Sequence, residues 1–86
     1  MQQFIHTIND PLGIHARPAG LLAKIAKDYP DTVITIAKGE ECVRATQLMK
    51  LMSLGVKRGD RVTVTAQGPS EAEAIVAVQR FFSENL

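Results

Sequence analysis

The chain has 86 residues, a formal net charge of +1 at pH 7 and 45% hydrophobic residues, so we expect residues 1–86 to form a single domain with one core. The nearly balanced charge and an aromatic content of only 5% argue against nucleic acid as a partner. A single cysteine and the absence of a long apolar run lead us to expect a cytoplasmic protein that does not insert into a membrane. We also expect it to be a monomer.

Residues 3–8 are rich in β-forming side chains and predict a first strand. His6 lies within this segment, and we expect its ring to be packed because no anion-binding sequence accompanies it. Residues 9–13 predict a loop, since an Asp-Pro pair starts turns and Gly13 tolerates a positive φ.

A first helix is predicted to begin at Ala16 or Arg17 and to end at Asp28 or Tyr29, where Pro30 stops it. Apolar side chains recur at helical spacing along this segment, at Leu21, Leu22, Ile25 and Tyr29.

The junction between this loop and this helix has the sequence Gly13-Ile14-His15-Ala16-Arg17-Pro18-Ala19. Pro18 suits the first turn, where its missing N–H would have no intrahelical partner. A helix N-terminus offers free N–H groups and the positive end of the dipole, so it favours anions such as phosphate. His15 can supply a nucleophilic nitrogen, and Arg17 can pair with phosphate oxygens. An ordinary surface histidine is the alternative, but the agreement of motif and helix register favours phosphoryl capture, with the Ala16 and Arg17 amides contacting the phosphate.

The next segment predicts a hairpin, with strands at residues 32–37 and 42–45 and a turn at residues 38–41. We expect Cys42 to be a packed thiol, because nothing nearby suggests the electropositive setting of a reactive cysteine.

Residues 46–54 predict a short second helix, with Thr46 as its N-cap and Gly55 at its C-terminal end. Its apolar residues are too many for one buried stripe: Leu48, Met49, Leu51, Met52 and Leu54. Some of them should therefore be exposed, and exposed methionine suits a surface that binds several partners. The alternative is a deeper helix with every apolar residue in the core.

The last part of the chain predicts a strand at residues 61–67 and a final helix that opens near Ser70. Ser70 and Glu73 have the spacing of a capping box. The apolar stripe of this helix consists of Ala74, Ile75, Val78, Phe81 and Phe82. The order β-α-β-β-α-β-α predicts an α/β (α+β) open-faced sandwich, in which three helices cover one face of a four-stranded, mostly antiparallel sheet.

The motif at residues 13–18 resembles the active-site signature of HPr, the histidine-containing phosphocarrier family of the bacterial phosphotransferase system. The resemblance continues through residues 48–56 and Gly59 and covers essentially the whole chain. It implies the fold given above and a carrier rather than an enzyme, with no metal or cofactor. It also implies that Nδ1 of His15 accepts a phosphoryl group from phosphorylated enzyme I, that Arg17 stabilises the charge, and that EIIA proteins or domains receive the group in sugar uptake.

The resemblance further implies that partners dock on the exposed side of the second helix, at Leu48, Met49 and Met52. From the first helix we add Lys24 and Lys27, whose charge suits acidic partners, although a merely solvated basic face is the alternative. We also add Gly20, because a glycine there can admit a partner closely; the alternatives are tight packing on the sheet and no role at all.

The sequence departs from the HPr pattern at two places. Many HPr proteins carry a regulatory serine where this chain has Gln47, so we expect no serine phosphorylation there. One extra residue lies between Tyr29 and Leu48, which leaves the register of the 32–45 hairpin open. Two other functions are considered: a regulatory HPr of a nitrogen-type or dihydroxyacetone-kinase system, and a small binding or acyl-phosphate-cleaving domain in which His15 is incidental.

Overall fold

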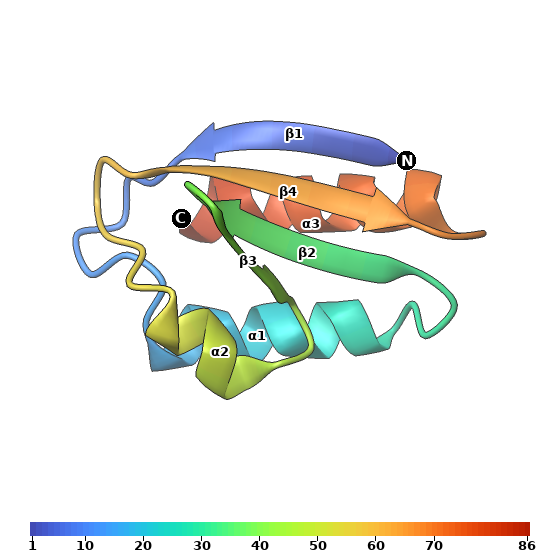
Figure 1. Cartoon of the computed structure of the whole chain (residues 1–86), viewed down its shortest axis with the longest axis horizontal. Helices are drawn as coiled ribbons and strands as arrows, with labels where there is room; N and C mark the ends of the chain where they lie inside the picture. Colours follow the sequence, from blue (N-terminus) through green and yellow to red (C-terminus); the bar gives the residue numbers. More distant parts are fainter.

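Strands and helices alternate along the chain in the predicted order, and a computed structural model describes all 86 residues, Met1–Leu86 (Figure 1). The elements are β1 (Gln2–Thr7), α1 (Ala16–Lys27), β2 (Val33–Lys38), β3 (Glu41–Arg44), α2 (Leu48–Ser53), β4 (Arg61–Gln67) and α3 (Glu71–Asn85). The sheet order is β1-β4-β2-β3, and every neighbouring pair is antiparallel. The predicted open-faced sandwich is therefore confirmed.

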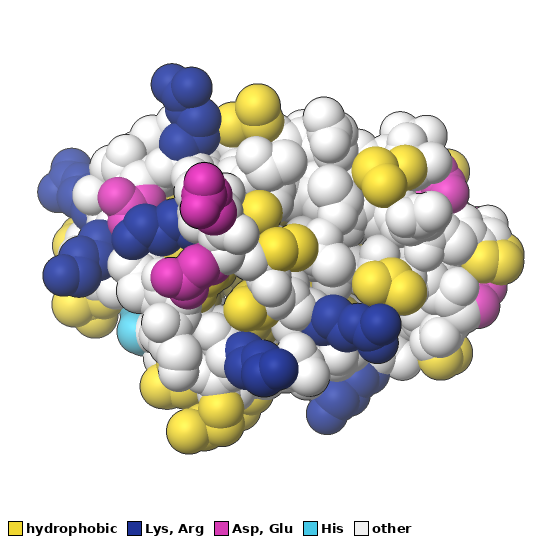
Figure 2. Space-filling view, viewed as in Figure 1, with side chains coloured by type: hydrophobic (Ala, Val, Ile, Leu, Met, Phe, Trp, Pro, Cys, Tyr) yellow, Lys and Arg dark blue, Asp and Glu magenta, His cyan; other side chains and the backbone are white.

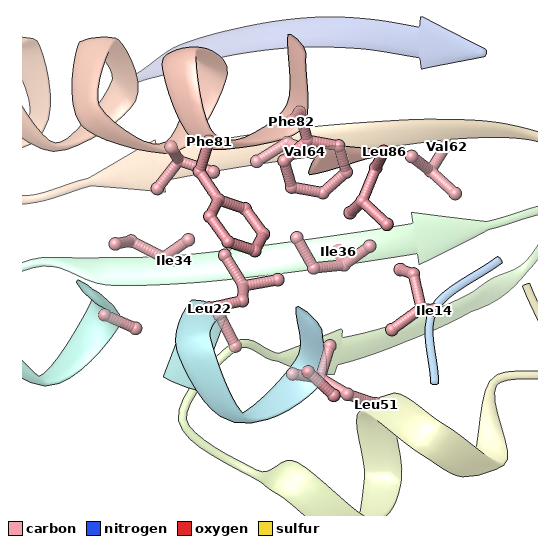
Figure 3. Packing of buried hydrophobic residues seen from close by; sticks show 14 of the residues in the cluster. Ile14, Leu22, Ile34, Ile36, Leu51, Val62, Val64, Phe81, Phe82 and Leu86 are labelled. Atoms are coloured by element: carbon pink, nitrogen blue, oxygen red, sulfur yellow. The ribbon is translucent and has the colours of Figure 1, made fainter. Parts of the chain in front are cut away.

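The core lies between the sheet and the helices, as Figure 3 shows. Side chains alternate between the two faces of a strand, so Ile34 and Ile36 of β2 and Val62 and Val64 of β4 all point toward the helices. Leu22 of α1 and Leu51 of α2 meet this layer from the other side. The predicted stripe of α3 is buried at all five positions: Ala74, Ile75, Val78, Phe81 and Phe82.

His6 packs against this core, as expected. Its ring is half-buried and lies edge-on to Phe82, with centroids 5.4 Å apart. Phe4, on the same face of β1, meets Phe82 in the same way at 5.6 Å. Aromatic edge contacts of this kind stabilise a core beyond simple area burial.

Cys42 is exposed, so the prediction of a packed thiol is wrong. The register pairs Cys42 with Ala37, and Ala37 points to the face of the sheet that carries no helix. Thr35 and Thr65 lie on this same face, and their hydroxyl groups are hydrogen-bonded to each other. In the observed register, the turn at residues 39–40 joins β2 to β3 and Cys42 lies on the face of the sheet that carries no helix.

The predicted N-cap of α2 is wrong, whereas Ser70 is the N-cap of α3 as expected but without the predicted side-chain capping. Helix α2 begins one residue later than expected, with Gln47 rather than Thr46 at its N-cap, and no side chain caps it. At α3, Ser70 is the N-cap, but its hydroxyl donates to Asp31 Oδ2 at 3.1 Å instead of to the helix backbone. Instead, Glu71 Oε1 in the first turn of the helix accepts a hydrogen bond from the amide of Gly68, which precedes the helix, at 3.2 Å.

Candidate functional site

The loop between β1 and α1 is tied to two other segments by its backbone. The Ile8 amide donates to the Asp60 carbonyl at 2.9 Å, and the Ile8 carbonyl accepts from Gly59 at 2.8 Å. The amides of Asn9 and Asp10 both donate to the carbonyl oxygen of Leu86, at 2.5 and 3.2 Å. The loop is therefore held by the start of β4 and by the end of α3.

The turn at residues 10–13 is built as the Asp-Pro sequence predicts. The Asp10 carbonyl accepts the Gly13 amide hydrogen at 3.0 Å, and Asp10 Oδ1 accepts that of Leu12 at 2.8 Å. Gly13 has φ +66° and lies against the Val56 carbonyl, where no side chain would fit. The next residue, Ile14, is buried and donates its amide hydrogen to Val56 at 3.2 Å. The loop is consequently fixed right up to His15.

His15 is the N-cap residue of α1, in an extended conformation with φ −108° and ψ −172°. Its carbonyl accepts the first intrahelical hydrogen bond, from the Ala19 amide at 3.0 Å, while its side chain makes no capping bond. The imidazole is half-exposed, and its Nε2 lies 3.9 Å from Asp10 Oδ1. The ring is thus held at the helix start but remains open to solvent and to a partner.

The first turn of α1 has the free donors that an anion site needs. The amides of Ala16 and Arg17 have no hydrogen-bond acceptor in the chain, and Pro18 has no N–H to satisfy. No acidic residue stands in this turn, so the positive end of the dipole is not neutralised there. The Arg17 side chain is exposed and makes no ion pair. This turn therefore presents two free amides and one arginine side chain without an ion-pair partner.

An exposed apolar surface lies beside this turn. Helix α2 packs on α1 and its Leu51 is buried in the core, whereas Leu48, Met49 and Met52 stay 40%, 73% and 40% exposed. Figure 2 shows hydrophobic side chains gathered over α2 near a histidine at the edge of the molecule. The expectation that some apolar residues of this helix face solvent is correct, and a helix wholly in the core is excluded.

The other candidate docking residues lie on α1. Lys24 and Lys27 are exposed, and Gly20 is half-buried with open space where a Cβ would be. Tight packing is therefore not the reason for the glycine. Leu21, one of the apolar residues at helical spacing in this segment, is 42% exposed, whereas its neighbour Leu22 is buried in the core. Leu21 and the 70% exposed Leu12 are apolar surface residues whose exposure the sequence pattern does not predict.

A polar cluster braces the segment on which Gly13 rests. Lys38 Nζ donates to the Gly55 carbonyl at 2.8 Å and lies 3.0 Å from Asp60 Oδ2. The same Asp60 oxygen accepts the Lys57 amide hydrogen at 2.8 Å. This backbone hydrogen bond and the Lys38 ammonium lower the pKa of the Asp60 carboxyl. Lys38 therefore joins β2 to the turn that supports the loop.

The surroundings of His15 form an open surface rather than a cleft. The one hollow in the chain, of 240 Å³, involves the far end of α1, with Lys27, Tyr29 and Arg44 in its lining. No group of three or more metal-ligating side chains comes together, and no helix has the length and apolarity to cross a membrane. The half-exposed His15 imidazole at the start of α1 thus lies on an open surface, away from this hollow.

Comparison with known proteins gives one consistent result. A family model described as the PTS HPr component phosphorylation site matches residues 2–84. The phosphocarrier protein HPr of Mycoplasma genitalium is 35% identical over 85 residues, which is 99% of this chain and 97% of that protein. The solved structure of HPr-C-His from Thermoanaerobacter tengcongensis is 35% identical, with a TM-score of 0.90 over 96% of this chain and 92% of that one. A Mycoplasma histidine-containing phosphocarrier protein is 34% identical, with a TM-score of 0.89 over 93% of this chain and 90% of that one.

Proposed function

The chain belongs to the HPr family of phosphocarrier proteins of the phosphotransferase system, and from this premise we propose that His15 is the residue that carries the phosphoryl group. A phosphocarrier is a protein substrate of successive transfer reactions and not an enzyme in its own right. The observation that carries the proposal is the half-exposed His15 imidazole beside the unpaired amides of Ala16 and Arg17.

The transfer step needs a neutral imidazole and a place for negative charge. One ring nitrogen of His15 donates its lone pair to phosphorus while the bond between phosphorus and the donor protein breaks. The Ala16 and Arg17 amides and the Arg17 guanidinium then neutralise the phosphoryl oxygens. We assign the reacting nitrogen as Nδ1, which leaves Nε2 on the side of Asp10.

An open site suits a relay better than a closed pocket would. A phosphoryl group held by two amides and one arginine is accessible to the next protein, whereas a buried group would have to be released first. Phosphorylated enzyme I is the proposed donor, and EIIA proteins or domains are the proposed acceptors. These partners supply the remaining catalytic groups when they dock.

The proposed docking surface consists of Leu48, Met49 and Met52 on α2 and of Gly20, Lys24 and Lys27 on α1. Its support is the exposure of the three apolar side chains, since clustered exposed apolar area usually marks a binding site. The two lysines add positive charge that favours an acidic partner surface. At the start of α2, Gln47 has no hydroxyl, so we propose that the family's serine kinase does not modify this chain there.

The test is phosphorylation in a mixture of phosphoenolpyruvate, enzyme I and this chain, followed by intact mass and peptide mapping. One phosphoryl group should appear on His15, and it should be labile in acid and stable in base, as a phosphoramidate is. A panel of EIIA, nitrogen-type and dihydroxyacetone-kinase acceptors then identifies the pathway. An acid-stable adduct, or one on another residue, would refute the assignment.

A further inference from the structure

Asp10 is the nearest carboxylate to His15, and three hydrogen bonds fix its position in the turn. Its amide donates to Leu86, its carbonyl accepts from Gly13, and its Oδ1 accepts from Leu12 at 2.8 Å. The same Oδ1 lies 3.9 Å from His15 Nε2. A carboxylate fixed in this way keeps its orientation without help from the imidazole.

We infer that Asp10 is a positioning residue for His15, one that keeps the ring proton on Nε2 and stabilises the ring when it becomes positive. The inference rests on the proposed phosphorylation of His15. A carboxylate beside Nε2 favours the tautomer with hydrogen on that nitrogen, which leaves the Nδ1 lone pair free. The gap of 3.9 Å is longer than a hydrogen bond, and such contacts commonly tighten when the reacting complex forms.

The imidazole ring of His15 becomes positively charged during phosphoryl transfer, and a nearby carboxylate stabilises that charge. When Nδ1 forms its bond to phosphorus, the bond between phosphorus and the donor breaks and its electron pair stays with the donor. The ring keeps its proton on Nε2 and therefore gains a positive charge next to Asp10. The phosphoryl oxygens lie beyond the opposite ring nitrogen, so their repulsion by Asp10 acts over a greater distance than its attraction for the ring.

The alternative is that Asp10 only forms the turn, and the Asp10→Asn variant separates the two roles. Asparagine supplies the same side-chain carbonyl to the Leu12 amide but has no charge. Asp28→Asn is the matched control, because it removes an exposed carboxylate from the other end of α1. Asp10→Ser is a second neutral variant that also accepts the Leu12 hydrogen bond.

The experiment measures three quantities on each folded variant: turnover with saturating enzyme I, its apparent KM, and the imidazole nitrogen shifts of the unphosphorylated protein by NMR. We expect Asp10→Asn and Asp10→Ser to lower turnover about fivefold or more, the effect of losing one unit charge at this distance in water. The KM should be unchanged, the share of His15 with its proton on Nε2 should fall, and Asp28→Asn should match wild type.

Wild-type turnover and an unchanged nitrogen spectrum in both neutral variants would overturn the role of Asp10. Failure of the underlying function has a different signature, because wild-type protein would then acquire no phosphoryl group, or would acquire it elsewhere. The NMR measurement needs no transfer reaction, so it tests the contact between Asp10 and His15 in either case.

Discussion

Gly13 rests on the carbonyl oxygen of Val56, so closely that the loop before His15 has no room for a side chain at this position. The Ile14 amide donates to the same carbonyl, and the segment below is braced by Lys38 and Asp60. The position of His15 therefore depends on contacts that link β2 to the segment between α2 and β4. The His15 imidazole is half-exposed, whereas Gly13, Ile14 and Val56, which hold the loop before it, are buried.

This relationship predicts that Gly13→Ala is more damaging than the same change at another glycine with positive φ. Gly39, at φ +60°, is the matched control, because an added Cβ there meets nothing within 4 Å. Gly39→Ala should cost about 1 kcal/mol from backbone strain alone. Gly13→Ala should cost about 2 kcal/mol more, because the loop must also move away from Val56, and it should slow transfer. Equal unfolding free energies for the two variants would contradict this account.

The fold was predictable because the sequence pattern is strong where the core is. The alternation of Val62, Val64 and Ala66 defines β4 to the residue, and the spacing in α3 identifies its buried stripe. The site motif was readable for a similar reason, since Pro18 and a helical pattern place His15 at a helix start.

What the sequence did not reveal depends on tertiary contacts. The orientation of Cys42 follows from its pairing with Ala37, which propensity does not determine. Helix α2 starts late because a turn, closed by the Gln47 amide and the Arg44 carbonyl, precedes it. The sequence identifies Asp10 only as a turn residue, because its distance from His15 depends on the folded loop.

Arg17→Lys keeps the charge and removes the planar fork of donors that fits phosphate oxygens. We expect transfer to slow about tenfold, the size of one lost charge-assisted hydrogen bond. Docking should change little, since the charge remains, so the apparent KM for enzyme I should stay near that of wild type. Arg80→Lys on α3 is the control. If the Arg17→Lys turnover equals that of Arg80→Lys, Arg17 does not hold the phosphoryl group.

Met49→Glu tests the docking surface. Met49 is 73% exposed, and a central interface residue of this kind contributes about 2 kcal/mol or more, at least tenfold in affinity. The apparent KM for enzyme I should rise, while the melting temperature should shift by only a few degrees, about as for other surface changes.

Val76→Glu is the matched control for Met49→Glu, because Val76 is 54% exposed on α3 and the change adds the same charge. It should leave KM unaltered. Equal effects of the two variants on KM would mean that added negative charge, and not the surface on α2, weakens the encounter.

The pH dependence of stability should reflect Asp60. Its pKa is lowered in the folded chain by the Lys57 amide and the Lys38 ammonium. In the pH window between the lowered value and the ordinary carboxyl value, the unfolded chain binds more protons than the folded one. The contribution of Asp60 is therefore complete above this window and is lost as the pH falls through it. Melting curves between neutral and strongly acidic pH measure the loss.

Asp60→Asn should flatten that acid dependence, because an amide keeps the Lys57 hydrogen bond but cannot titrate. Glu40→Gln, a neutralising change in the exposed turn between β2 and β3, should keep the wild-type dependence. An Asp60→Asn variant that loses stability toward acid as steeply as wild type would exclude Asp60 as the cause.

The central claim is that His15 is the phosphoryl carrier, and intact mass spectrometry tests it most directly. Wild-type chain and His15→Ala are incubated separately with phosphoenolpyruvate and enzyme I. Since His15 is half-exposed at a loop–helix junction, His15→Ala should fold and melt close to wild type. The account predicts the added mass of one phosphoryl group on wild type, removed by acid, and none on His15→Ala. A phosphorylated His15→Ala protein, or an unmodified wild type beside an HPr that enzyme I does phosphorylate, would contradict it.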